Sequence, residues 1–113
     1  DMISDELATA VLRREFTDSA VWLALHAADP RDGAEELTIR QLSVWAEPIG
    51  RECSLAERPV WDPMPSAKVT HWSAWDAAVG GTVKWTGRFG TAITVAAGDG
   101  FRIPAGELTV YFE

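Results

Sequence analysis

Hydrophobic positions recur at helical spacing only near the start of the chain. Ile3, Leu7 and Val11 fall on one face of a helix with about 3.6 residues per turn. Ser4 precedes two acidic residues, an arrangement that caps a helix and complements its dipole. The pattern predicts one short α-helix over residues 3–16, which must dock its apolar stripe on a larger body.

From residue 20 onward the spacing changes to the alternation that is typical of half-buried strands. Val21, Leu23 and Leu25 fall on one face of the first run, and Trp22 falls on the other. Turns rich in glycine and proline separate the later runs, which cover residues 37–45, 60–61, 68–76, 82–86, 91–96, 101–103 and 107–113. Short alternating strands of this kind predict a mainly β fold, an antiparallel and jelly-roll-like β-sandwich over residues 20–113.

Two of these segments carry a more specific expectation. Gly80 and Gly81 separate the runs 68–76 and 82–86 and predict a tight turn. Prolines bracket the run 60–61, and because proline donates no ladder hydrogen bond, this run is expected at an edge or in an irregular connection.

Length and composition limit the class of protein. A chain of 113 residues is expected to form a single domain, 1–113, and its 47% hydrophobic content excludes a disordered chain. The net charge of −7 argues against a nucleic-acid partner, which needs clustered Lys and Arg. The longest nearly apolar run, 20–28, is far too short for a membrane span, and the acidic N-terminus does not predict a signal peptide.

Candidate chemistry is sparse. Cys53 is the single cysteine, and neither it nor His71 sits in a protease-like signature, so a small buried side chain is favoured over a hydrolase nucleophile. Asp29, Asp32 and Glu35 crowd one loop, but without EF-hand spacing a plain turn is favoured over a calcium site. We therefore predict no catalytic residue, no cofactor and no metal site.

Six tryptophans against one tyrosine are the unusual feature of the composition. Trp75 and Trp85 share strand faces with valines, which favours core packing. The positions of the other four leave core and surface open, and tryptophan is common at interface hot spots and on sugar-binding platforms. The candidate interaction surface that we predict consists of Trp45, Trp61, Trp72 and Tyr111.

Several segments, taken in order, resemble a known family. Residues 69–77, followed by Gly80 and Gly81, and residues 95–108 resemble small tail-fibre-like virion proteins of tailed bacteriophages, including phages of actinobacteria. Residues 23–30 and 35–41 match upstream segments of that family, so the similarity runs from about residue 20 to residue 112. Trp72 and Ser73 depart from it, because a smaller aliphatic residue and a glycine are usual there.

The resemblance implies a non-enzymatic structural protein of the virion, in the tail fibre, as a minor tail protein or as a capsid decoration. Its expected partners are copies of itself, with a trimer as the first expectation, and other virion proteins. Its expected location is the virion, after assembly in the host cytoplasm. The alternative is a carbohydrate-binding module that recognises the host cell envelope through its tryptophans.

Overall fold

The computed structural model describes residues 3–57 and 59–113. Over these residues one α-helix, a π-helical turn, a short 3-10 turn and eight strands follow one another. They are α1 (Asp5–Leu12), η1 (Arg13–Thr17), β1 (Val21–His26), η2 (Pro30–Asp32), β2 (Gln41–Trp45), β3 (Glu52–Glu57), β4 (Val60–Trp61), β5 (Ala67–Trp75), β6 (Val83–Val95), β7 (Phe101–Arg102) and β8 (Thr109–Tyr111). The predicted mainly β fold with one short N-terminal helix is confirmed.

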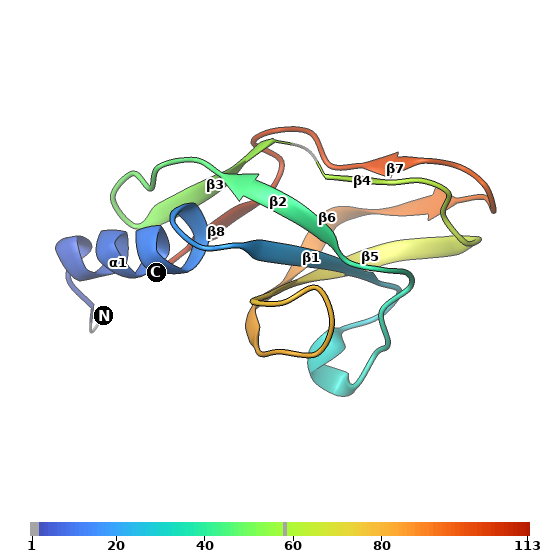
Figure 1. The fold of residues 1–113 in the computed structure, drawn as a ribbon, viewed down its shortest axis with the longest axis horizontal. Helices are drawn as coiled ribbons and strands as arrows, with labels where there is room; N and C mark the ends of the chain where they lie inside the picture. Colours follow the sequence, from blue (N-terminus) through green and yellow to red (C-terminus); the bar gives the residue numbers. More distant parts are fainter. Residues whose placement is uncertain (1–2, 58) are drawn as a thin grey trace.

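The strands form two antiparallel sheets. Six of them follow the order β6-β5-β1-β2-β3-β8, while β4 and β7 form a two-stranded sheet. In Figure 1 the large sheet curls, and β4 and β7 lie across from β1 and β5. Trp61 of β4, Phe101 of β7 and Leu25 of β1 belong to one buried cluster. The two sheets therefore face each other across a shared core, as the sandwich prediction requires.

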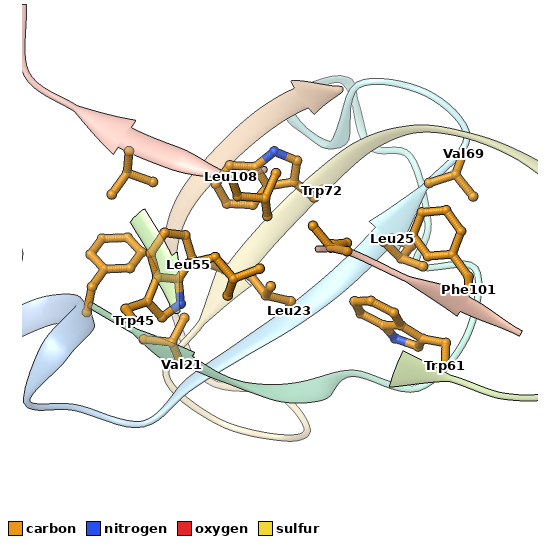
Figure 2. Close-up of a cluster of buried hydrophobic side chains, with 14 of the residues drawn as sticks. Val21, Leu23, Leu25, Trp45, Leu55, Trp61, Val69, Trp72, Phe101 and Leu108 are labelled. Carbon is orange, nitrogen blue, oxygen red and sulfur yellow. The ribbon is translucent and has the colours of Figure 1, made fainter. Parts of the chain in front are cut away.

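The alternation in β1 sets the inner face of the large sheet. Val21, Leu23 and Leu25 are all fully buried, and Figure 2 shows them along the length of the cluster. Burial of a side chain of this size contributes roughly 1.5–3 kcal/mol. The predicted apolar face of β1 is thus confirmed.

The predicted N-terminal helix is also confirmed. The Ser4 side chain accepts a hydrogen bond from the backbone N–H of Leu7 at 3.2 Å and caps α1. Leu12 is fully buried, and η1 then widens the last turn and buries Phe16. The helical segment thereby covers one end of the core, where the Phe16 ring lies 4.8 Å from that of Trp45.

Two strands differ from the sequence pattern. β3, in which Cys53 and Leu55 are buried, was not predicted, because two prolines and a glycine (Pro48, Pro59 and Gly50) flank it. β6 joins the predicted runs 82–86 and 91–96 into one strand. The turns expected between those runs are replaced by an irregularity in the pairing with β5, and the chain continues without leaving the sheet.

The connection between β5 and β6 is longer than a tight hairpin turn. Residues 76–82 form it, and the Asp76 side chain accepts a hydrogen bond from the backbone N–H of Thr82 at 2.8 Å. Gly80 and Gly81 have φ angles of +67° and +74°. Glycine is favoured at both positions because other residues avoid this left-handed region.

Candidate interaction surfaces

Three of the four residues predicted to form an interaction surface lie in the core. Trp45, Trp61 and Trp72 are 3%, 1% and 3% exposed, and Figure 2 shows their rings among the buried side chains. Tyr111 differs, since 55% of it is exposed. The prediction of an exposed tryptophan surface is therefore wrong for these three residues, and Tyr111 stays a predicted contact residue.

An irregularity in the pairing of β5 with β6 explains why Trp72 points inward. The register of β5 against β6 shifts between Val69 and His71, and both Val69 and Trp72 are buried although they lie three residues apart. Strict alternation predicts opposite faces for these two residues, whereas a bulge breaks the alternation. The longer segment of this bulge lies on β6, where Arg88 to Ile93 pairs with His71 to Val69 of β5. Gly87, the partner of Trp72 on β6, leaves room for the indole: a Cβ there would lie 2.5 Å from the ring.

The other two buried tryptophans each find an acceptor for the indole N–H. Trp61 donates to the backbone carbonyl of Ile39 at 2.9 Å. Trp45 donates to the Ser43 hydroxyl, also at 2.9 Å. A buried indole with its hydrogen bond satisfied is a stable core residue, so the apolar bodies of these rings need no partner outside the protomer.

Of the two tryptophans predicted to lie in the core, one does and the other does not. Trp85 packs against the core cluster, with its ring 5.8 Å from that of Phe112, as predicted. Trp75 lies on the opposite face of β5 from Trp72, paired with Trp22 of β1. The core prediction is therefore wrong for Trp75, again because the bulge reverses the expected faces.

Exposed apolar side chains gather on the outer face of the large sheet. Trp22 pairs with Leu42 of β2, and Leu42 is 51% exposed. Ile39 and Val79 border the same hollow as Trp22 and are 73% and 88% exposed. Val44, two residues beyond Leu42, is also exposed. We call these five residues the outer patch, and contiguous apolar surface of this kind is typical of interaction sites.

Arg40 holds the two loops that carry Ile39 and Val79. Its side chain is almost fully buried and forms a two-pronged pair with Glu36, at 2.8 and 2.9 Å. It also donates to the backbone carbonyls of Ala77 and Gly80, at 2.8 and 2.7 Å, and its guanidinium lies 3.9 Å from the centre of the Trp75 ring. Paired, hydrogen-bonded and stacked in this way, Arg40 fixes the shape of the outer patch.

A buried histidine at the end of β1 bonds to the loop that leads to Ile39. The Nδ1–H of His26 donates to the Glu35 carbonyl at 3.0 Å, and Nε2 accepts from the Ser73 hydroxyl at 2.7 Å. Ser73 accepts in turn from the indole N–H of Trp75 at 2.7 Å. This chain of bonds suits the neutral ring, and burial lowers the pKa of His26 below its ordinary 6.5.

A family model described as podophage GP4 fiber I protein gp80 matches residues 1–111. The chain belongs to this family. Membership supports a structural role in a phage tail fibre and an association with the virion, as the resemblance implied. A search of curated proteins finds no match.

The geometry of this fibre protein does not assemble the nucleophile considered above. Cys53 is 1% exposed, its thiol donates to the Ala46 carbonyl at 3.1 Å, and burial raises its pKa. His71 forms its side-chain hydrogen bond with Thr70, at 2.7 Å, and lies on the outer side of β5. A thiol that is held neutral and shielded from water is a poor nucleophile.

The acidic loop is a turn, as favoured from the sequence. Asp29 caps the 3-10 turn η2 and pairs with Arg31 at 2.7 Å. Within residues 3–57 and 59–113 there is no cluster of three His, Cys, Asp or Glu side chains suited to a metal ion. The same residues contain no helix that is both long and apolar enough to cross a membrane.

The sequence pattern placed Trp22 on the outer face of β1 but missed the other four residues of the outer patch. Ile39, Leu42 and Val44 alternate with buried neighbours, but an apolar residue on either side of such a strand fits both faces equally well. Val79 lies in the loop next to Gly80, where its 88% exposure depends on the loop's path. In the sequence, only the apolar character of the loop before Gly80 indicated that Val79 could be exposed.

Proposed function

We propose that this chain is a non-enzymatic fibre subunit that self-associates at the outer patch and attaches to other proteins of the virion. The proposal rests on one observation: Ile39, Leu42 and Val79 are large, apolar and more than half exposed on a surface whose loops Arg40 fixes. A preorganised apolar surface loses little conformational entropy on association and gains from the removal of water. Three copies are the stoichiometry that we expect.

The surroundings of Cys53, for which a structural role was favoured over that of a nucleophile, support the non-enzymatic part. Cys53 is buried and hydrogen-bonded to a backbone carbonyl, and its thiol contacts Thr17 instead of a histidine. Function then consists of buried apolar area and shape, with no chemical step.

Sedimentation equilibrium tests the self-association. Val79→Glu places a charge in the outer patch at a loop position that is 88% exposed, so it leaves the core intact. Ile49→Glu, at the 80% exposed residue between β2 and β3, is the matched control outside the patch. We expect the wild-type chain and Ile49→Glu to associate alike, and Val79→Glu to weaken association by about tenfold or more.

A wild-type chain that stays monomeric at every concentration would contradict self-association itself. If both variants weaken self-association equally, or if neither variant weakens it, the interface lies outside the outer patch. Mass spectrometry of purified virions tests attachment, and absence of the chain from the particle would refute it.

The alternative of a tryptophan platform for host glycans loses its motivating residues. Trp61 and Trp72 are 1% and 3% exposed, so neither ring can stack on a sugar without unfolding its surroundings. Any saccharide site on this protein must use other side chains.

A further inference from the structure

A second hollow on the outer side of the protein gathers two arginines and a histidine. Arg31 lies in η2, His71 on β5 and Arg88 on β6, and all three line one hollow of about 360 Å³ together with Asp29. His71 and Arg88 are direct partners across the β5–β6 pair. Pairing of the strands and docking of η2 therefore bring together nitrogen donors that are far apart in the sequence.

The local charge is opposite to that of the whole molecule. The chain carries −7 overall, yet Asp29 is the only carboxylate that borders this hollow. Arg31 holds Asp29 through Nε and Nη2, at 3.2 and 2.7 Å, and lowers the pKa of this carboxyl to about 2. Asp29 thus stays ionised and paired with Arg31. Arg88 also borders a neighbouring hollow that Glu107 and Glu113 line, but among the described residues it forms no ion pair with either of them.

The donors that remain are suited to an anion. Among the residues that the structure describes, Arg88 is exposed and has no ion pair and no side-chain hydrogen bond. His71 uses Nδ1 to bond with Thr70, which leaves Nε2 for another partner, and Arg31 has Nη1 left beyond its bonds to Asp29. A planar guanidinium presents two parallel N–H groups to a carboxylate.

The surroundings of these donors suit a sugar better than a bare ion. Thr86 and Gly87 line the same hollow, and an adjoining hollow that shares His71 and Arg88 is lined by small side chains and by Phe89. Hydroxyl groups match sugar hydroxyls, while small apolar side chains and an aromatic ring match the C–H faces of a sugar.

We propose that this hollow is a binding site for an acidic saccharide of the uronate type, with a sugar carboxylate held by Arg88 and by the free edge of Arg31. His71 and Thr86 then contact neighbouring hydroxyls. The site uses no residue of the outer patch, so the proposal is independent of self-association.

Isothermal titration calorimetry of the full chain tests the site with trigalacturonate and with neutral galactotriose. We expect saturable binding of trigalacturonate and binding of galactotriose that is at least about tenfold weaker. Arg88→Gln is expected to weaken trigalacturonate binding by about tenfold or more. Arg102→Gln is the matched control, because Arg102 is an exposed arginine on β7 that borders a different hollow, and its affinity should equal that of the wild type.

Several outcomes would overturn the proposal: no saturable binding of trigalacturonate, equal affinity for galactotriose, or unchanged affinity in Arg88→Gln. Acetate and inorganic phosphate are titrated alongside. Binding of either ion as tight as that of trigalacturonate would show a site for simple anions and would overturn the saccharide assignment. Circular dichroism of Arg88→Gln confirms that a loss of binding comes from the folded variant.

Discussion

At the scale of single residues, two glycines next to β5 are required for different reasons. Gly81 has a φ of +74°, and a Cβ there would lie 2.3 Å from the Asp76 carboxylate and 2.9 Å from the Cβ of Ala77. Gly80 has a similar φ, +67°, but open space around it. Gly81 therefore combines backbone strain with a steric clash, while Gly80 carries the backbone requirement alone.

Gly81→Val should lower the free energy of unfolding by more than about 1 kcal/mol, because both costs apply. Gly80→Val should cost less, since the new side chain meets no other atom within 4 Å. Urea denaturation of both variants measures the difference. A Gly81→Val protein as stable as the wild type would contradict the loop geometry.

His26 is the second residue with a measurable consequence. Its ring is 2% exposed and bonded at both nitrogens in the neutral form. Burial lowers its pKa, while the charge of Glu36 opposes this and that of His71 adds to it. Protonation would turn Nε2 into a donor and oppose the bond that it accepts from Ser73.

Stability should therefore fall as the pH drops. Above the ordinary pKa of 6.5 the ring is neutral in both the folded and the unfolded chain, and the full contribution of His26 to the free energy of unfolding is present. Below it the unfolded chain takes up a proton before the native chain does, so the free energy of unfolding decreases down to the folded pKa. Urea titrations between about pH 5 and about pH 8 measure this slope. His26→Gln should remove the slope and His71→Gln should retain it, whereas a slope that survives in His26→Gln would assign it to another group.

At the scale of elements, β5 and β6 decide which aromatic side chains face the core. The bulge near Thr70 puts Trp72 inside and Trp75 outside, the reverse of simple alternation. The sequence predicted where β5 lies and that it pairs with β6. It did not predict the bulge, because the mismatch between the short segment of β5 and the longer segment of β6 exists only once the two strands pair.

Gly87→Ala tests this arrangement. The new Cβ would lie 2.5 Å from the Trp72 ring, so the strand or the indole must shift, and overpacking of this kind costs typically about 1–3 kcal/mol. Gly90→Ala on the same strand is the control, since nothing lies within 4 Å of its added Cβ. Chemical denaturation compares the two. Equal stability of both variants would mean that Trp72 is not packed on Gly87.

At the scale of the whole molecule, the charge of −7 opposes contact between copies. Burial of the apolar side chains of the outer patch offsets this repulsion. The hollow at Arg88, in contrast, gathers local positive charge. The two surfaces therefore depend on different forces, the first on removal of water and the second on attraction between opposite charges.

Salt should affect the two surfaces in opposite directions. Raising sodium chloride from about 0.05 M to about 0.5 M shortens the screening length several-fold, so repulsion between acidic copies weakens and self-association should tighten. Binding of trigalacturonate at Arg88 should weaken over the same range, because screening reduces its attraction. Sedimentation and calorimetry at matched salt concentrations measure both trends. Self-association that weakens with salt would point to an ionic interface instead of the outer patch.

The sequence by itself determined the N-terminal helix, most of the strands and the inward face of β1. Capping residues and alternation act over a few neighbouring positions, so local spacing contains that information. It also determined the glycine requirement near residue 81 and the lack of a local catalytic motif.

Only the tertiary structure decided which tryptophans are buried. Trp45, Trp61 and Trp72 depend on a bulge, on a glycine of the partner strand and on acceptors such as the Ile39 carbonyl, all of which come from other elements. The outer patch and the cationic hollow have the same origin, since Arg40 joins two loops and Arg88 meets Arg31 only in the folded chain. Faces and sites of this kind arise from long-range packing, which the spacing of residues along the chain does not encode.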